Sequence, residues 1–418
     1  MAHEIIVVGA GIIGATTALR LTEAGHRVTA IDPEEPGGEA AASYGNGGWI
    51  SPASIIPMSM PGLWRKVPGY LLDREGPLTL DIASVPRMMP WLWRFLLAGS
   101  TEAKVRKTAA NLNWLISDGP ARHLSLSGKV GNDRLVVQKG LLYAYPDRAA
   151  FEAEGLSWQI RRDNGLVFEE WDRASLRTRM PALSESYGFG VFVAAGAHCL
   201  DTGSYVAAIM RTAQSRGAML KAAKVTALTG GVRPGVRLST GETLQADRVI
   251  MAAGIHSRAL MATLGIRVLL ESERGYHITV ANQPTPFDIP IMPSTGRMAN
   301  TPTNMGLRLS GQVELAAIDR KPNWKRAEIL RRHAWATYPY LAQTNPQDLR
   351  RWMGHRPSTP DGLPLIGAFT KEPNIIAAFG HGHIGIIAGP KTAELVAAGI
   401  DGALPPEAAV FMPRRVGQ

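Results

Sequence analysis

One stretch near the N-terminus constrains the fold more than any other feature of the chain. Residues 4–32 read EIIVVGAGIIGATTALRLTEAGHRVTAID, in which the apolar run Ile5 to Val8 precedes three glycines spaced as G-x-G-x-x-G. A β-branched run without polar breaks is typical of a strand buried on both faces of a parallel sheet. A helical pattern follows the glycines, and Arg27 to Ile31 predicts a second strand. We therefore predict a βαβ unit over this stretch.

The three glycines of this unit suit different tasks in a mononucleotide-binding fold. Gly9 permits a tight turn, Gly11 lets the backbone approach a pyrophosphate, and Gly14 lets helix and strand pack closely. The start of the helix offers N–H groups and the positive end of its dipole to phosphate charge. Asp32, which lies 23 residues after Gly9, can accept hydrogen bonds from ribose hydroxyls. The stretch predicts a nucleotide site and leaves NAD and FAD both open.

Length and composition are those of a soluble globular protein with two or three domains. The chain has 418 residues, of which 45% are apolar and 19% charged. Its single cysteine, Cys199, excludes a disulfide framework or a cysteine metal cluster within one chain, and we expect no metal and a cytoplasmic setting. The first strand leaves no room for a signal peptide, and no apolar run reaches the length of a membrane span.

The net charge of +10 is compatible with several classes of partner. A basic surface would suit an anionic substrate, an anionic lipid or a nucleic acid, and the charge alone does not decide among them. The densest basic segment is a predicted helix from Lys325 to Tyr338, for which a solvated helix face is the preferred interpretation over a nucleic-acid patch. We expect no nucleic acid as a partner.

Two segments after the opening unit have unusual composition. Residues 34–52 are rich in glycine and alanine, and small side chains there would let the backbone pass close to a bulky ligand, with Ser43 available to donate to a phosphate. Residues 54–100 are apolar but broken by prolines, and they predict short helices and turns. Within them, PRMMPWLWRFLLAG at 86–99 fits a lid, packed core or a membrane-surface element, and the first two are preferred because no long basic amphipathic face is present.

The middle of the chain predicts a second unit and then a return to the first. A helix is expected near Glu102 to Leu126, and residues 135–193 contain short strand patterns with helices between them. Residues 266–345 contain further strand patterns, among them Tyr276 to Val280. Arg248 to Ala252, followed by Ala253-Gly254, repeats the strand-then-glycine pattern of the N-terminus, so we expect this strand in the nucleotide domain.

A second strand, glycine turn and helix occur near the C-terminus. Asn374 to Phe379 predicts a buried strand, and the turn GHGHIG at 380–385 leads into a helix that runs to about Gly399. The start of such a helix would stabilise negative charge on a cofactor ring. Pro390 is expected in the first helical turn, where its missing N–H costs little.

Upstream of this pattern, Arg356 lies between His355 and Pro357 in a segment that we interpret as a proline-stiffened turn. Such a turn would hold the guanidinium in one place, and a fixed planar fork suits a substrate carboxylate. A structural ion pair is the alternative on these residues alone.

Together these features resemble the FAD-dependent D-amino acid dehydrogenase family, within the group of glycine, sarcosine and D-amino acid oxidoreductases. The resemblance covers roughly residues 4–400, and the combination of motifs is more specific than any one of them. Its marks are GAGIIG at 9–14, SYGNGGWISP at 43–52, AAG at 252–254, RGYHIT at 274–279, HRPSTPDGLPLIG at 355–367 and GHGHIG at 380–385.

The resemblance implies a fold, a division of the chain and a set of site residues. The fold is α/β, with a Rossmann-like FAD-binding domain formed by residues 1–53, 195–265 and 350–418. A discontinuous α+β substrate (cap) domain on an antiparallel sheet takes 54–194 and 266–349. Expected contacts with FAD are Gly9, Gly11, Ile12, Ile13, Gly14, Asp32, Ser43, Asn46, Gly47, Gly48, Val225, Ala253, Gly254, Gly354, Gly382, His383, Ile384, Gly385 and Ile386.

The resemblance also assigns the substrate side of the site. In the family, the arginine of the R-P-x-T-P-D-G block binds the substrate carboxylate, which makes Arg356 the principal expected residue. Tyr276 and His383 are expected as further pocket contacts, and Trp49 is expected to wall the flavin ring. His383 occupies a turn position that varies in the family, so contact with substrate and simple packing beside the ring are both open.

One departure concerns how the cofactor is held. Relatives with covalent flavin place a cysteine near the R-P-x-T-P-D block or a histidine in the loop after the second strand. This chain has neither, and reads Tyr44, Gly45 and Asn46 after Ser43. We therefore expect non-covalent FAD.

The expected reaction is oxidation of a D-amino acid, or of a D-imino acid such as a hydroxyproline, by hydride transfer from Cα to flavin N5. The electron acceptor is expected to be a quinone or an electron-transfer protein, and contact with the inner face of a membrane stays open. Two alternatives are an oxygen-using oxidase of glycine or sarcosine type and, less favoured, a flavoprotein that modifies tRNA. A plain NAD-linked dehydrogenase would leave the Ser43 loop and the GHGHIG turn unexplained.

Overall fold

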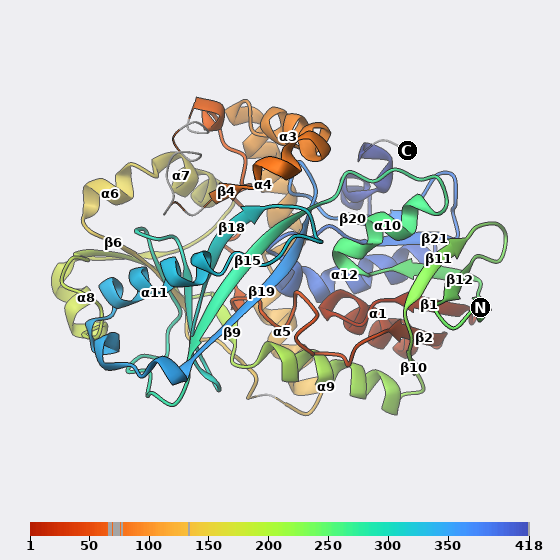
Figure 1. Cartoon of the computed structure of the whole chain (residues 1–418), viewed down its shortest axis with the longest axis horizontal. Helices are drawn as coiled ribbons and strands as arrows, with labels where there is room; N and C mark the ends of the chain where they lie inside the picture. The colour runs from red at the N-terminus through yellow and green to blue at the C-terminus, as the bar shows by residue number, and fades with distance from the viewer. Residues whose placement is uncertain (66–68, 70–75, 77, 133, 417–418) are drawn as a thin grey trace.

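The computed structural model describes residues 1–65, 69, 76, 78–132 and 134–416, which form two large sheets with helices packed on them (Figure 1). The first sheet has six strands in the order β10-β2-β1-β14-β21-β20, all parallel except for β20. In that order the strands are Met219–Ala222, Arg27–Asp32, Glu4–Val8, Arg248–Met251, Ile375–Phe379 and Leu365–Ala368.

The N-terminal βαβ prediction is confirmed. Helix α1, Ile12–Glu23, connects β1 to β2, and these strands pair in parallel. The strand predicted from the RVIMAAG segment is β14, which pairs with the other side of β1 and places Ile250 opposite Val7. The nucleotide sheet is therefore assembled from segments more than 200 residues apart, as the repeated strand-then-glycine pattern indicated.

Helices cover the first sheet and bury its apolar side chains. Helix α1 packs against α9 (Thr202–Ser215) and α12 (Gly385–Ile400), and α12 in turn contacts α4 (Glu102–Ile116) and α5 (Gly119–Lys129). The single helix expected near Glu102 to Leu126 is thus two helices, and the second has a proline in its first turn.

The second sheet has nine strands and carries helix α11 (Lys325–Thr337) on one face. Its order is β19-β15-β18-β17-β16-β6-β8-β7, with β4 beside β18. The pairs are antiparallel except for β16 with β6 and β18 with β4. The strands in that order are Leu349–Ser358, Glu271–Val280, Gly306–Leu315, Ala299–Thr303, Ile291–Pro293, Leu141–Tyr145, Phe189–Val193, Glu169–Trp171 and Leu78–Leu80.

Two small sheets and several short helices complete the described residues. One sheet contains β11, β12 and β13 (Val225–Thr229, Gly235–Leu238 and Thr243–Gln245), and the other contains β3, β9 and β5 (Trp49–Ile50, Ala197–Cys199 and Val136–Val137). The other helices are α3 (Val85–Ala98), α6 (Arg148–Glu152), α7 (Gly155–Asp163), α8 (Arg173–Arg179), α10 (Ser257–Ala262) and the 3₁₀ turns Ile82–Ser84, Gly254–His256, Pro339–Gln343, Pro346–Asp348, Pro406–Phe411 and Pro413–Val416.

Two ten-residue strands, β15 and β19, correct the sequence interpretation. Only Tyr276 to Val280 was expected as a strand, because the preceding residues are charged, and Arg356 was expected in a turn. Both segments are strands that pair along their whole length. The charged residues of β15 are buried in the sheet rather than solvated, and Pro357 is tolerated because β19 is an edge strand.

The domain division stays a proposal, and the packing favours two changes to it. Strand β19 was expected in the nucleotide domain, but it is the edge strand of the nine-stranded sheet. Helices α4 and α5 were expected in the cap, but their apolar side chains share one core with α1 and α12.

The position of Pro390 was predicted wrongly. It is the sixth residue of α12 and lies inside the helix, not in its first turn. A proline there cannot donate to the carbonyl of Ile386, four residues earlier. The ring of His123 on α5 fills that role, because its Nε2 lies 2.7 Å from the Ile386 oxygen while its Nδ1 lies 2.9 Å from the Tyr205 hydroxyl. The carbonyl that the proline leaves open therefore joins α5, α9 and α12.

The proline-broken stretch 54–100 contains one long helix among its described residues; residues 66–68, 70–75 and 77, with Pro68 and Pro77, lie outside them. Helix α3 buries Met88 and Trp91, and the Trp91 indole donates to the Ser358 carbonyl at 2.9 Å. Met89, Trp93 and Leu97 of α3 are exposed, and Figure 1 shows α3 at the periphery of the molecule. Among the described residues, no helix is both long and apolar enough to cross a membrane.

Candidate active site

One large cavity, with a volume of about 1510 Å³, is lined by residues of both large sheets. At one end lie the glycines that follow β1, and at the other lie residues of β15, β18 and β19. Sites for small ligands usually measure about 300–1,000 Å³, so this volume suits a dinucleotide cofactor together with a substrate.

At the nucleotide end, the opening glycines are required by close contacts. Gly9 has a φ of +101°, and a Cβ on it would lie 2.5 Å from the Ala252 oxygen. A Cβ on Gly14 would lie 1.9 Å from the Gly9 oxygen. No side chain larger than hydrogen fits at either position, which agrees with the tasks assigned to these glycines from the sequence.

Two polar side chains organise the backbone around the start of α1. The Ser43 hydroxyl oxygen accepts from Ile12 N–H at 3.0 Å, so its own hydrogen is left to donate to a ligand. Asp32 accepts from Ala10 N–H at 2.7 Å and from Glu34 N–H at 3.0 Å. The carboxylate is thereby held at the cavity wall with further acceptor capacity, and its contact with ribose stays a prediction.

At the other end, the GHGHIG turn is fastened to the end of β19. Gly382 N–H donates to the Pro357 oxygen at 2.8 Å, and Ser358 forms a β-bridge with His381. Helix α12 begins at Gly385, so its N-terminus faces the cavity from behind this turn. The two motifs that the resemblance brought together are therefore joined in space.

Arg356 lies in this region with its guanidinium over a glycine of the neighbouring strand. A Cβ on Gly275 of β15 would lie 2.3 Å from Arg356 Cζ. Across the strand pair, Arg356 is in register with Glu273, so both side chains project from the same face of the sheet. Burial lowers the pKa of Arg356 and the Glu273 charge opposes that shift. The guanidinium stays charged and is the cation best placed for an anionic group.

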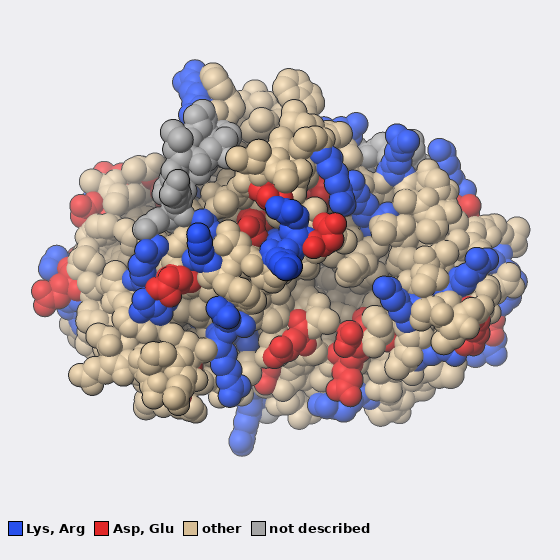
Figure 2. All heavy atoms as spheres, viewed as in Figure 1, with Lys and Arg blue, Asp and Glu red and all other residues tan. Residues whose placement is uncertain are grey.

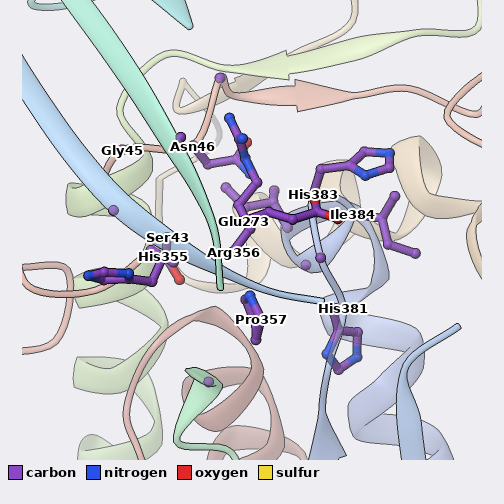
Figure 3. Close-up of a pocket in the computed structure, with 18 of the residues that line it drawn as sticks. Ser43, Gly45, Asn46, Glu273, His355, Arg356, Pro357, His381, His383 and Ile384 are labelled. Carbon is purple, nitrogen blue, oxygen red and sulfur yellow. The ribbon is translucent and has the colours of Figure 1, made fainter. Parts of the chain in front are cut away.

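Three histidines lie in this region, and they differ in orientation. In Figure 3, His383 lies close to Arg356 and Glu273, whereas His355 and His381 point away from that group. The His381 ring bonds to Thr392 at 2.9 Å and the His355 ring to Ser272 at 2.8 Å. Burial and the neighbouring Arg356 charge lower the pKa of His383 to about 4, so it is neutral near pH 7.

Trp49 also lines the cavity, on the cap side. Its indole N–H donates to the Thr301 hydroxyl at 3.0 Å, and its ring meets Tyr143 edge-on with centroids 5.7 Å apart. These contacts fix the ring plane as part of the wall, and its contact with a flavin ring stays a prediction.

Most of the expected site residues line this one cavity, and three do not: Tyr276, Gly14 and Gly48. The exception of Gly14 agrees with its packing role. Those that line it are Gly9, Gly11, Ile12, Ile13, Asp32, Ser43, Asn46, Gly47, Trp49, Val225, Ala253, Gly254, Gly354, Arg356, Gly382, His383, Ile384, Gly385 and Ile386.

The prediction for Tyr276 was wrong. Side chains alternate along β15, so Tyr276 projects from the opposite face to Glu273 and Gly275 and packs beneath α11. Its hydroxyl donates to Glu314 at 2.5 Å and accepts from Asn323 N–H at 2.9 Å. Gly48 does not line the cavity either, and a Cβ on it would meet the Cys199 carbonyl at 2.7 Å, so its contact with the cofactor stays a prediction.

The sequence interpretation missed several cavity residues. Glu273 directly precedes the RGYHIT motif, and Gly275 is the second residue of that motif. The two-residue period of a strand was the signal that could have selected them instead of Tyr276. Tyr143 and Arg161 come from β6 and α7, where no motif marked them.

Comparison with known proteins places the chain in a family. The sequence profile described as DAO, FAD dependent oxidoreductase, matches residues 4–398. The chain belongs to this family. This FAD-dependent oxidoreductase is 43% identical over 406 residues to a D-amino-acid oxidase of Bradyrhizobium diazoefficiens, with 96% of each chain covered. It is 28% identical over 411 residues to a D-amino acid dehydrogenase of Methylobacterium nodulans, again covering 96% of each.

The fold of this oxidoreductase is also that of solved structures. A glycine oxidase from Geobacillus kaustophilus superposes with a TM-score of 0.75 at 20% identity, covering 99% of this chain and 98% of the other. The expected α/β fold, a Rossmann-like domain beside a sheet-based substrate domain, is thereby confirmed.

The residues present fit FAD as the cofactor of this family. One long cavity connects the glycine turn after β1 to the GHGHIG turn, and Gly9 and Gly382 have positive φ angles of 101° and 52° that bring backbone to its wall. The start of α1 would hold the pyrophosphate, and the residues around Gly382 would lie at the flavin ring.

Proposed function

We propose that this oxidoreductase oxidises the α-carbon of a D-amino acid or D-imino acid. The observation that carries the proposal is Arg356, whose charged guanidinium lies beside the GHGHIG turn in the cavity that fits FAD. The D-amino-acid oxidase and D-amino acid dehydrogenase names of its relatives support the substrate class. When bound, the flavin supplies the acceptor for a hydride from Cα.

The contribution of the chain is to bind and orient the substrate. Arg356 would hold the carboxylate through two parallel hydrogen bonds, which fixes the plane of the adjacent Cα. His383 and Trp49 would limit where the side chain and amine can lie. Orientation of this kind lowers the barrier because it removes translational and rotational freedom before the reaction.

The deciding experiment is anaerobic mixing of the purified holoenzyme with a panel of D- and L-amino acids, glycine, sarcosine and hydroxyprolines. Oxidised flavin absorbs near 450 nm, roughly, as a property of the cofactor. We expect D-configured substrates to bleach this band. Retention of colour with every member of the panel would refute the proposal.

A second candidate concerns the electron acceptor. A quinone or electron-transfer protein is the acceptor proposed from the sequence, but the 43% identical relative named an oxidase favours oxygen. Peroxide formed in air at the rate of substrate loss, without added dye or quinone, would select the oxidase.

We propose that FAD is held without a covalent bond. The sequence has no cysteine near the R-P-x-T-P-D block and no histidine in the loop after the second strand, the two residues that carry a covalent flavin in relatives. Acid precipitation should release all the yellow colour into the supernatant. Colour retained on the pellet would show a covalent link.

We also propose a cytoplasmic enzyme with a peripheral membrane contact through α3. Its outer face exposes Met89, Trp93 and Leu97, with Arg87 and Arg94 beside them. Aromatic and aliphatic side chains flanked by arginine suit an anionic bilayer surface. The protein should float with phosphatidylserine vesicles, and Trp93→Ser should reduce this. If the protein stays at the bottom of the gradient while the vesicles float, the membrane contact is ruled out.

Acidic side chains are interspersed with the basic ones on the face shown in Figure 2. This distribution supports the proposal that the charge of +10 serves solubility rather than nucleic-acid binding.

A further inference from the structure

Glu273 is a buried carboxylate of the cavity wall for which the proposed function has no role. It is 5% exposed and lies on β15 opposite Arg356. Among the residues that the structure describes, no ion pair within 4.0 Å joins Arg356 to a carboxylate. The Arg356 nitrogens and the Glu273 oxygens are therefore on the same face of the sheet but do not form a salt bridge. A buried charge in this position is costly unless something in the site compensates it.

The groups around Glu273 come from two neighbouring elements. Arg356 and Ser358 project from β19, and His381 and His383 from the GHGHIG turn. Burial raises the pKa of Glu273, and the Arg356 charge opposes that shift. Burial lowers the pKa of His381 to about 3 and that of His383 to about 4, so both rings are neutral near pH 7. Arg356 is thus the cation facing this carboxylate.

Substrate binding changes this balance of charge. An α-amino acid carries a carboxylate and an ammonium group on the same carbon. When the substrate carboxylate pairs with Arg356, the Glu273 carboxylate loses its compensating cation within a site of low dielectric constant. The ammonium group restores neutrality, because it lies one carbon from the carboxylate and is the only cation that the substrate brings.

We propose that Glu273 binds the α-ammonium group of the substrate and accepts one proton from it. This inference rests on the proposed function. In the step, an N–H bond of the ammonium breaks and an O–H bond forms on the Glu273 carboxylate, with no change of oxidation state. The product is the neutral amine, the form from which Cα can release a hydride to become an iminium carbon.

A second, small cavity also adjoins Glu273. A small cavity of about 30 Å³ is lined by Glu273, Ser358, His381 and His383. A volume of this size admits a water molecule, for which about 10–15 Å³ suffices. Glu273 borders both this space and the large cavity. The carboxyl group can therefore accept a proton from a substrate in the large cavity and pass it to a water molecule in the small one.

The test compares two ligands on the holoenzyme. Kd values are measured from the change in flavin absorbance for a D-amino acid under anaerobic, pre-steady-state conditions and for benzoate, a carboxylate without an amine. In Glu273→Gln, we expect the amino acid to bind roughly tenfold or more weakly, because a charged hydrogen bond is lost. Benzoate should bind several-fold more tightly, because a negative charge near its carboxylate is removed.

A merely structural role for Glu273 would weaken both ligands together. Glu271→Gln provides the matched control: Glu271 lies two residues earlier on the same strand, is also 5% exposed, pairs with Arg258 and does not line the cavity. We expect neither Kd to change in that variant. Parallel weakening of benzoate and amino acid in Glu273→Gln would overturn the inference.

The pH profile of kcat/KM gives the second readout. Glu273→Gln should move the acidic limb of the profile toward higher pH, to where the amine loses its proton in water. An unchanged profile, or a shift produced by His383→Asn and not by Glu273→Gln, would overturn the inference. A wild-type enzyme that oxidises no amino acid would instead refute the proposed function, so the two failures are distinguishable.

Discussion

Arg356 is the residue expected to bind the substrate carboxylate. Arg356→Ala should raise the KM for carboxylate substrates roughly 100-fold, because truncating one partner of a buried charge pair costs several kcal/mol, about 2–5. Arg356→Lys should recover only part of this, because an ammonium lacks the planar fork. Steady-state kinetics provide the measurement, and unchanged parameters in the alanine variant would remove Arg356 from the site.

Tyr276 is adjacent in sequence to the cavity residue Gly275, but its side chain projects from the opposite face of the sheet. Tyr276→Phe removes a hydroxyl that bonds both Glu314 and Asn323. We expect the free energy of unfolding to fall by about 1–3 kcal/mol while KM is unchanged, since the loss leaves buried partners unsatisfied. Denaturant unfolding and kinetics on the same preparation measure both; a raised KM with unaltered stability would contradict the structure.

Paired strands make the arginine site sensitive to a glycine on β15. A methyl group at Gly275 would lie within 2.3 Å of Arg356 Cζ, so Gly275→Ala should displace the guanidinium and raise KM with little change in FAD content. Gly128→Ala in α5 is the control, because nothing lies within 4 Å of its added Cβ. Equal kinetics for the two variants would show that β15 does not position the arginine.

Helix α12 offers a second prediction at the level of elements, through the proline that lies inside it. His123→Ala should be destabilising, because it leaves the Ile386 carbonyl and the Tyr205 hydroxyl without their partner, at about 1–3 kcal/mol for each buried group. In a Pro390→Ala background the loss should be smaller, because the backbone N–H that the substitution introduces can donate to the Ile386 carbonyl. The unfolding free energies of the wild type, the two single variants and the double variant give the coupling energy between positions 123 and 390. Additive effects of the two substitutions would contradict this account.

The elements differ in how well the sequence predicted them, for physical reasons. The βαβ unit at 4–32 and the turn at 380–385 were clear because local pattern and glycine spacing act within one short segment. Strand β15 was only half recognised, because its Glu-Ser-Glu-Arg run is polar and its burial is decided by β18 and β19, distant in sequence. The two-residue period separates Tyr276 from Glu273 and Gly275, but which of the two faces is turned to the cavity is decided by elements distant in sequence.

For the whole molecule, buried histidines predict loss of stability in mild acid. Burial lowers the pKa of His123 and His198 to about 4 and that of His277 to about 3, from 6.5. The unfolded chain therefore binds more protons below pH 6.5, so the stability that these groups permit is present above 6.5 and falls as the pH drops toward 4. Each contributes about 1.4 kcal/mol per pH unit in that window.

Melting temperatures of the holoenzyme between pH 7.5 and 5 should therefore decrease steadily below pH 6.5. His198→Phe, which removes a buried ring whose Nδ1 has no partner, should flatten the slope even where it changes the absolute stability. A melting temperature independent of pH in this range would show that these rings are solvated.

The β-bridge between Ser358 and His381 also limits where chimeras of related enzymes can be joined. Because β19 ends on the GHGHIG turn, a transplanted cap sheet would bring the cofactor-side turn out of alignment unless both are taken from one parent. Recombinants that keep residues 271–280 and 349–385 together should assemble with FAD, whereas junctions placed between 358 and 381 should give colourless protein. Engineering a new substrate range by recombination therefore requires that β19, which carries Arg356, and the GHGHIG turn come from the same parent.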